Sequence, residues 1–234
     1  MDQLGALKEK VALACRILER AGHGDYNLGH VAARAGEVMY MKPAGLGLGE
    51  ITAEDVLTLD LDGKVLEGRH KSHGEWPIHT AIFRARPEVG GIVHTHPPYV
   101  TAYSSLGREP LILNQDGVPF AGGVAIFDQT PELITTPEMG RSLAERLGNR
   151  RAAILKNHGL VTVGETIEEA VYLAVSIEKS LRIQWIAAAF GARTGTAPGA
   201  IAPEVAGRML EAEVRNPARL RGIWDYLVRQ LETR

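Results

Sequence analysis

The sequence is poor in several features that mark particular protein classes. It has one cysteine, Cys15, which excludes an internal disulfide; its place on an apolar helical face predicts a buried, unreactive thiol. Lys and Arg number 26 against 28 Asp and Glu, which leaves no basic excess for a nucleic-acid surface. The sequence shows no long apolar run, signal peptide or lipidation motif, so we expect a cytoplasmic protein without membrane contact.

The rest of the composition is that of an ordinary globular protein. Apolar residues make up 45% and charged residues 23% of 234 residues, which is enough apolar material for one well-buried domain over residues 1–234. Residues 191–203 are rich in Gly, Ala, Thr and Pro. They are predicted to link this body to C-terminal helices at about 203–231.

Hydrophobic periodicity predicts helices that alternate with short strands. Leu7, Val11, Cys15 and Leu18 recur at helical spacing and place an amphipathic helix before Gly22. An Asp-Gly pair at 62–63 lies between two strand-like runs and favours a tight hairpin turn. Further helices are expected at about 77–86, 98–106, 137–147, 165–189, 203–215 and 217–231, and strands at about 29–34, 38–42, 56–61, 64–67, 91–93, 111–114, 124–127, 152–156 and 160–163.

A histidine pair follows the predicted buried strand at 91–93 and suits a metal site. Side chains two apart on a strand point to the same side, so His94 and His96 can direct both imidazoles at one point. Glu75 precedes a predicted helix, and His158 follows another apolar run. An isolated His-x-His pair is weak evidence, but three neutral imidazoles and a carboxylate together suit Zn, Mn, Fe or Co.

These motifs resemble those of a known family. The matching stretches are Glu75-Trp-Pro-Ile-His, Arg84-Ala-Arg-Pro-Glu-Val, His94-Thr-His-Pro-Pro-Tyr and Lys156-Asn-His-Gly. They follow the order typical of the class II aldolase and adducin family, and the resemblance runs from about Leu7 to about Gly191. It implies an α/β fold with three layers, α/β/α, around a central, mostly antiparallel sheet. It also implies a homotetramer with active sites at subunit interfaces, near the C-terminal helices.

The resemblance further implies a divalent metal ion, Zn, Mn, Co or Fe, that is held by His94, His96 and His158. Glu75 is implied as a fourth ligand or as an acid/base group. In this family a C-terminal aromatic side chain can reach the metal of the neighbouring subunit. Tyr226 or Trp224 could take that role here, and packing in the core or interface is the alternative.

The sequence departs from the family's aldolases at the positions where those enzymes hold the phosphate of a sugar phosphate. They use small hydroxyl side chains and backbone amides there, because phosphate oxygens need several short donors. At the matching positions this sequence has Ala32, Ala44, His73 and Gly74. A phosphorylated substrate is therefore not expected. His30 and His73 instead add two imidazoles that are expected to face the substrate.

These departures resemble the decarboxylase branch of the family, which removes a carboxylate ortho to a ring hydroxyl from 3,4-dihydroxyphthalate or 3-hydroxy-2-methylpyridine-4,5-dicarboxylate. The predicted partner is thus a small aromatic hydroxy acid. His73, with His30 as second choice, is predicted to protonate the ring carbon, because histidine is the usual acid near neutral pH. Candidates for binding the second carboxylate are Lys42, Arg69, His70 and Lys71, with a solvated strand end or plain loop charges as the alternatives.

Two other functions stay open on the sequence. The first is an aldolase that cleaves an unphosphorylated hydroxy-keto acid or sugar acid, because that reaction needs the same electron sink on a metal. The second is a metal-free, adducin-like binding module. Such domains can lose their metal ligands, whereas this sequence has the three histidines and the glutamate.

Overall fold

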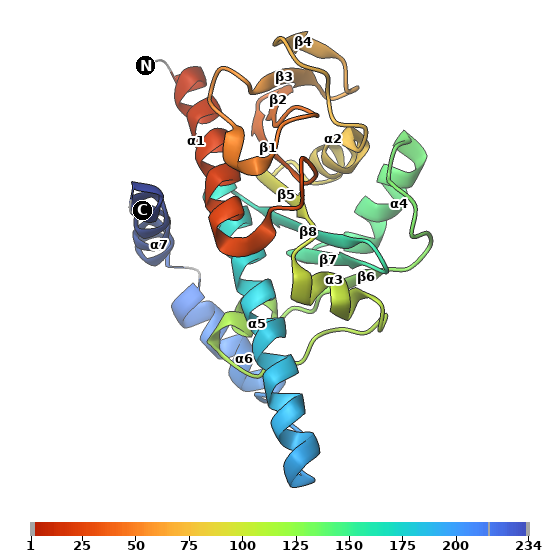
Figure 1. The fold of residues 1–234 in the computed structure, drawn as a ribbon, viewed down its shortest axis with the longest axis vertical. Coiled ribbons are helices and arrows are strands. Elements are labelled where there is room, and N and C mark those ends of the chain that lie inside the picture. Colours follow the sequence, from red (N-terminus) through yellow and green to blue (C-terminus); the bar gives the residue numbers. More distant parts are fainter. Residues whose placement is uncertain (1–2, 215, 233–234) are drawn as a thin grey trace.

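The computed structural model describes residues 3–214 and 216–232 and builds them around one mixed sheet (Figure 1). Among these residues the sheet has eight strands in the order β4-β3-β2-β1-β5-β8-β7-β6. Neighbouring strands are antiparallel except β6 and β7, which are parallel. The strands are β1 (His30–Ala35), β2 (Val38–Met41), β3 (Leu57–Asp60), β4 (Val65–Glu67), β5 (Gly91–Thr95), β6 (Ala125–Phe127), β7 (Ala152–Leu155) and β8 (Gly159–Gly164).

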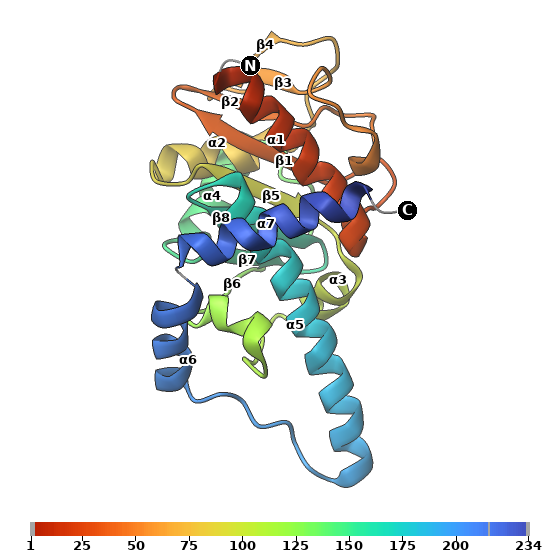
Figure 2. The ribbon, with the colours of Figure 1, turned by 90° about the vertical axis from the view of Figure 1, so that its left-hand side faces the viewer.

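Helices cover both faces of this sheet (Figures 1 and 2). The helices are α1 (Gln3–Leu18), α2 (Trp76–Ala85), α3 (Pro98–Ser104), α4 (Pro137–Leu147), α5 (Ile167–Thr194), α6 (Pro203–Met209) and α7 (Pro217–Glu232). Val31 and Val93 pack with α1, α5 and α7 in one apolar cluster, whereas Ala32 and Ile92 pack with α2 and α4 in another. Alternate residues of each strand thus face opposite layers, and the expected α/β/α fold is confirmed.

The start of α5 fixes the position of the central strand β5. Thr166 caps this helix, since its Oγ1 accepts a hydrogen bond from the Glu169 N–H at 3.2 Å. A Cβ added at Gly91 would lie 2.4 Å from the Ile167 Cα, so only glycine permits this close approach. The Gly-Gly lead-in to β5 therefore lets helix and strand pack tightly behind the histidine pair.

Some expected elements differ from the structure. The strand predicted at 111–114 is wrong: the Leu111 N–H donates to the Gln184 Oε1 at 2.8 Å, and the Ile112 carbonyl accepts from the Ile201 N–H at 2.8 Å. These backbone groups pair with α5 and with the segment after it rather than with the sheet. The predicted linker is shorter than expected, because α5 continues to Thr194.

The C-terminal helices also differ in detail from the prediction. α6 ends at Met209 and passes into a wider turn over Leu210–Val214, and the predicted helix end at Arg215 lies outside the described residues. Figure 2 shows α7 lying across the same face as α1 and α5, with α5 extending well past the sheet. In the described part of the chain, we find no helix with the length and apolar character needed to cross a membrane.

Candidate metal centre

Three histidines from two separate motifs converge at one end of the sheet. β5 ends at Thr95, which places His94 within the strand and His96 just beyond it. His158 lies in the turn between β7 and β8, where Asn157 takes a left-handed backbone with φ 57° that asparagine tolerates. The ring centroids lie 4.9 Å apart for His94 and His96, 5.0 Å for His94 and His158, and 5.2 Å for His96 and His158.

The hydrogen bonds of the rings leave lone pairs that point at one another. The Leu160 carbonyl lies 3.0 Å from the His94 Nδ1, and the Asp25 carboxylate lies 3.1 Å from the His96 Nδ1. Both partners only accept, so each Nδ1 must carry the proton and each neutral ring exposes a lone pair at Nε2. These two Nε2 atoms are 3.2 Å apart. Two lone pairs cannot bond to each other, whereas a cation between them satisfies both.

His158 gives a second sign that the donor set fits a metal ion. Within the described residues, its buried Nδ1 and Nε2 atoms have no hydrogen-bond partner. A buried polar ring without a partner is costly unless a ligand or ion satisfies it. The three imidazoles also match the nitrogen-rich donor sets preferred by Zn, Mn, Fe or Co. The residues present therefore fit a divalent metal ion.

Glu75 brings a carboxylate to the same point. It immediately precedes α2 and is 2% exposed, and its Oε1 accepts a hydrogen bond from the Ile134 N–H at 2.9 Å. The other oxygen, Oε2, lies 3.5 Å from the His94 Nε2 and 3.7 Å from the His30 Nε2. Burial alone raises the pKa of Glu75, but the adjacent His30 and His94 rings outweigh burial and lower it well below its ordinary value. An ionised carboxylate at this place is suited to act as a fourth ligand.

A second group of histidines adjoins Glu75 on its other side. The His30 and His73 ring centroids are 4.2 Å apart, and the His30 Nδ1 lies 2.6 Å from the His79 Nε2. His30 and His79 are fully buried, whereas His73 is half-buried. Burial lowers the pKa of His73 to about 4, and the negative charge of Glu75 partly opposes this shift. The structure thus brings both predicted imidazoles next to the carboxylate.

The candidates for binding a second carboxylate have different surroundings. Lys42 is fully buried and donates to the carbonyls of Asn27 and Pro43 at 3.1 and 3.2 Å, which excludes a solvated strand end. Arg69 and His70 both contact the Asp55 Oδ1, at 2.7 and 3.0 Å, so both already pair with a carboxylate of the protein. The carbonyl of Lys71 accepts from the Ala44 N–H at 3.0 Å and holds the loop to the turn after β2.

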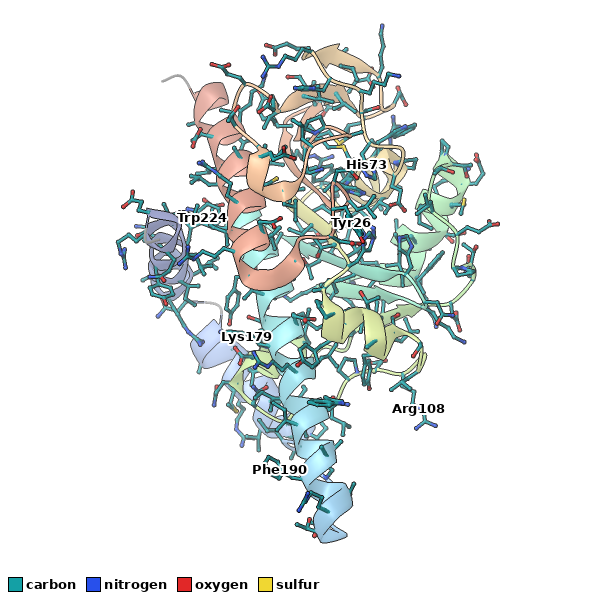
Figure 3. All side chains as sticks on the ribbon, in the orientation of Figure 1. Tyr26, His73, Arg108, Lys179, Phe190 and Trp224 are labelled. Atoms are coloured by element: carbon teal, nitrogen blue, oxygen red, sulfur yellow. The ribbon has the colours of Figure 1, made fainter. Side chains whose placement is uncertain are left out.

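The two C-terminal aromatic candidates, Trp224 and Tyr226, differ in burial. Trp224 is 8% exposed and packs in the apolar cluster with α1 and α5, as its core-packing alternative predicts. Figure 3 shows it across α1 from His73. Tyr226 is 52% exposed on α7, so a role toward a neighbouring subunit stays a prediction.

Sequence reasoning missed Asp25, although its carboxylate orients His96. A single aspartate in a glycine-rich turn gives no signal in the sequence, because its partner is 71 residues away. Carboxylates that hold a ligand histidine raise its basicity and fix its direction. We expect Asp25→Asn to weaken metal binding about 10- to 100-fold, measured by titration calorimetry with Zn²⁺ or Mn²⁺.

Asp62→Asn is the matched control for this substitution, because Asp62 is largely exposed and pairs with Arg84. It should leave metal affinity unchanged. Equal metal affinities in the Asp25→Asn variant and the unmodified protein would show that the contact between Asp25 and His96 does not strengthen metal binding.

Comparison with known proteins finds relatives that match most of the chain. The family model for the class II aldolase and adducin N-terminal domain matches residues 9–185. A 3,4-dihydroxyphthalate decarboxylase from Arthrobacter keyseri is 34% identical, with 73% of this chain and 74% of that protein covered. A 5-methylthioribulose-1-phosphate/5-deoxyribulose-1-phosphate aldolase from Rhodospirillum rubrum is 31% identical, with 77% and 80% covered.

Solved structures show the same architecture. The L-fuculose 1-phosphate aldolase from Glaciozyma antarctica superposes with a TM-score of 0.85 at 28% identity, covering 99% of this chain and 92% of that one. Sequence and fold thus agree over most of the chain, including the strand and turn that carry His94 and His158. The chain belongs to the class II aldolase and adducin family.

Proposed function

We propose that the protein is a metal-dependent decarboxylase that removes a carboxylate ortho to a ring hydroxyl from an aromatic or pyridine dicarboxylate. Its relatives named above are lyases of two kinds, a decarboxylase and an aldolase. One observation favours the decarboxylase. His30 and His73 stand beside Glu75, at positions where the family's aldolases carry hydrogen-bonding groups for a sugar phosphate. The half-buried imidazole of His73, in place of a small hydroxyl side chain, suits an unphosphorylated acid better than a phosphate ester.

In this proposal His94, His96 and His158 hold the metal, with Glu75 as fourth ligand or as acid/base group. The chemistry that a bound divalent ion supplies is Lewis-acid stabilisation of the charge that moves onto the ring oxygen. The protein holds the metal-binding side chains in position. Leu160 and Asp25 hold two of the rings at Nδ1, and the Ile134 N–H holds the carboxylate.

The proton for the ring carbon comes from His73. When the C–C bond breaks, CO₂ leaves and the bonding electron pair stays on the ring carbon, which then takes a proton from the imidazole. Burial holds the pKa of His73 at about 4 in the substrate-free site, so in this proposal the ring takes up its proton only when the negative charge of the bound dicarboxylate lies beside it. His73 is half-buried and can take that proton from solvent. His30 is fully buried with its Nδ1 against His79, so it remains the second choice. Lys42 lies close enough to His73 for its charge to lower the pKa of that ring, and it is the proposed partner of the carboxylate that stays, although burial also lowers the pKa of Lys42 itself.

We also propose a single domain that assembles as a homotetramer with active sites at subunit interfaces. The half-exposed Tyr226 on α7 supports this part, because an aromatic ring on the outer surface of a C-terminal helix is available to a neighbour. Arg69, His70 and Lys71 lie in the polar loop between β4 and α2 and remain candidate contacts for the second carboxylate.

The proposal is tested by incubating the metal-loaded protein with 3,4-dihydroxyphthalate and measuring CO₂. We expect CO₂ release that a chelator abolishes and that Mn²⁺, Co²⁺, Fe²⁺ or Zn²⁺ restores to different extents. His73→Ala should keep its metal but release CO₂ about 10²- to 10⁴-fold more slowly, the usual contribution of a positioned acid. Full activity in metal-free protein would contradict the mechanism.

The same experiment separates the alternatives. Release of pyruvate or an aldehyde from a hydroxy-keto acid, without CO₂ from the aromatic acid, would assign the aldolase function. A purified protein that takes up no divalent metal and turns over neither compound would match the adducin-like module. An unchanged rate in His73→Ala would remove only that residue from the mechanism.

A further inference from the structure

Tyr26 occupies a backbone conformation that its side chain disfavours. The Leu28 N–H donates to the Asp25 carbonyl at 2.9 Å, which closes a turn with Tyr26 at its first central position. There Tyr26 has φ 51°, in the left-handed region. Glycine, asparagine and aspartate are the usual residues for this position. Among the described residues, only Tyr26 and Asn157 combine a side chain with a positive φ, and Asn157 is a type that tolerates it.

Contacts on both sides of Tyr26 fasten this turn to the candidate metal centre. Asp25 binds the His96 Nδ1, and the Asn27 carbonyl accepts a hydrogen bond from the buried Lys42. A Cβ added at Gly29 would lie 3.4 Å from the His94 carbonyl oxygen, so the end of the turn runs directly along β5. The turn is therefore part of the rim of the histidine cluster, and Figure 3 shows Tyr26 and His73 on the same side of the molecule.

The Tyr26 ring is left almost bare at this rim. It is 92% exposed, although an aromatic ring gains most from burial. Its backbone is pinned by the anchored neighbours, and a tyrosine has only two rotatable side-chain bonds, so little conformational freedom is lost when the ring meets a ligand. Local strain that is retained beside a functional site is a recurrent mark of function. A glycine would make an easier turn here, so the aromatic side chain itself calls for an explanation.

We propose that the Tyr26 ring stacks against the aromatic ring of the substrate and thereby selects aromatic over aliphatic hydroxy acids. This inference rests on the proposed function and names the residue that recognises the ring. Asp25 and Lys42 would hold the turn so that its aromatic side chain meets a ring whose hydroxyl and carboxylate groups lie toward the histidines. Offset or edge-to-face aromatic pairs of this kind contribute about three- to tenfold in affinity.

The test measures binding rather than turnover, with 3,4-dihydroxybenzoate as the aromatic probe and tartrate as the aliphatic one. 3,4-Dihydroxybenzoate lacks the carboxylate that departs, so it is not consumed. In the metal-loaded Tyr26→Gly variant we expect about three- to tenfold weaker binding of the aromatic probe and unchanged tartrate binding. Tyr26→Phe should bind both probes like the unmodified protein, because the ring is kept.

The thermal stability of the same variant distinguishes recognition from a structural role. Glycine relieves the positive φ, so we expect Tyr26→Gly to melt about 2–4 °C higher. A residue that only supported the turn would give lower stability together with weaker binding. Leu66→Ala serves as a control for losing an exposed apolar side chain, because Leu66 is 51% exposed on β4 at the far edge of the sheet. It should change neither affinity.

Several outcomes would overturn the inference. They are unchanged affinity for 3,4-dihydroxybenzoate in Tyr26→Gly, an equal loss for both probes, or a change in oligomeric mass that shows the ring covered by another subunit. If the unmodified protein releases CO₂ from 3,4-dihydroxyphthalate while Tyr26→Gly binds the aromatic probe normally, only the inference fails. If the unmodified protein binds tartrate but neither aromatic acid, the proposed function fails as well.

Discussion

Replacing His158 with alanine is expected to empty the metal centre while leaving the metal-free chain folded. Both ring nitrogens of His158 lack a hydrogen-bond partner within the described residues, so the substitution breaks no hydrogen bond of the metal-free protein. Its side chain is 7% exposed and contacts His96 face to face, so the loss of packing is small beside the loss of a ligand. This residue therefore separates metal binding from folding better than His94, which is fully buried within β5 and bonded to Leu160.

The expected losses of metal affinity and activity in His158→Ala follow from the role of His158 as a ligand. Losing even the partner of a ligand histidine costs about 10- to 100-fold in metal affinity. Losing the ligand itself should cost at least about 100-fold, and CO₂ release should fall about 10³-fold or more with it. Metal content after dialysis, CO₂ release and circular dichroism of the metal-free protein measure the three effects separately.

Asn157→Gly is the matched control, because it alters the adjacent residue of the same turn. Glycine accepts the φ of 57° at this position, so the turn should keep its shape and the variant should keep its metal. A His158→Ala protein that still carries one equivalent of metal and turns over the substrate would contradict the proposed ligand set.

The metal-ligand candidates could be read from the sequence because each depends on local pattern. The spacing of His94 and His96 on a strand fixes their common side without any knowledge of the rest of the fold. Likewise, the turn at Asn157-His158-Gly159 follows from an apolar run that ends in residues tolerant of a left-handed backbone. Their convergence depends on the sheet order, which places β5 beside β8 and which the sequence did not predict; before the structure, only the family resemblance placed the three histidines at one metal ion.

The side chains and backbone groups that hold the candidate ligands in place could not be predicted in the same way. Asp25 lies 71 residues from His96, and Ile134 lies 59 residues from Glu75, so neither contact leaves a local pattern. The burial of Lys42 was missed for a related reason. A lysine at the end of a strand is normally solvated, and here a turn at Asn27 folds over it and supplies a carbonyl acceptor.

The error at 111–114 has the same origin. The backbone N–H and C=O groups of a short apolar run can find hydrogen-bond partners in a sheet or in a loop. Hydrophobic periodicity does not distinguish the two cases. In this fold the Leu111 N–H bonds to the Gln184 side chain and the Ile112 carbonyl bonds to the Ile201 N–H, so these groups do not pair with a strand.

Acidification from pH 7 to pH 5 is expected to destabilise the metal-free protein strongly. Burial lowers the pKa of His23 from 6.5 to about 4 and that of His79 from 6.5 to about 3. Below about pH 6.5 the unfolded chain therefore takes up protons that the folded chain refuses. The unfolded state gains free energy from these protons, so stability is present above pH 6.5 and is lost as the pH falls toward 4.

The expected loss of folding free energy is large relative to the total stability of a domain. At pH 5 each histidine costs about 2 kcal/mol, because a shift of one pKa unit corresponds to about 1.36 kcal/mol. Together they cost about 4 kcal/mol out of a total of about 5–15 kcal/mol. The melting temperature of the metal-free protein should therefore drop by about 8–16 °C between pH 7 and pH 5, as followed by circular dichroism.

His23→Gln tests whether the buried imidazoles cause this drop. The His23 Nδ1 contacts the Thr95 Oγ1 at 2.9 Å, and a glutamine amide can keep a polar contact there without taking up a proton. Because one of the two protons is then absent, the variant should lose about half as much stability as the unmodified protein over the same pH range. An equal loss in both proteins would mean that other groups drive the acid transition.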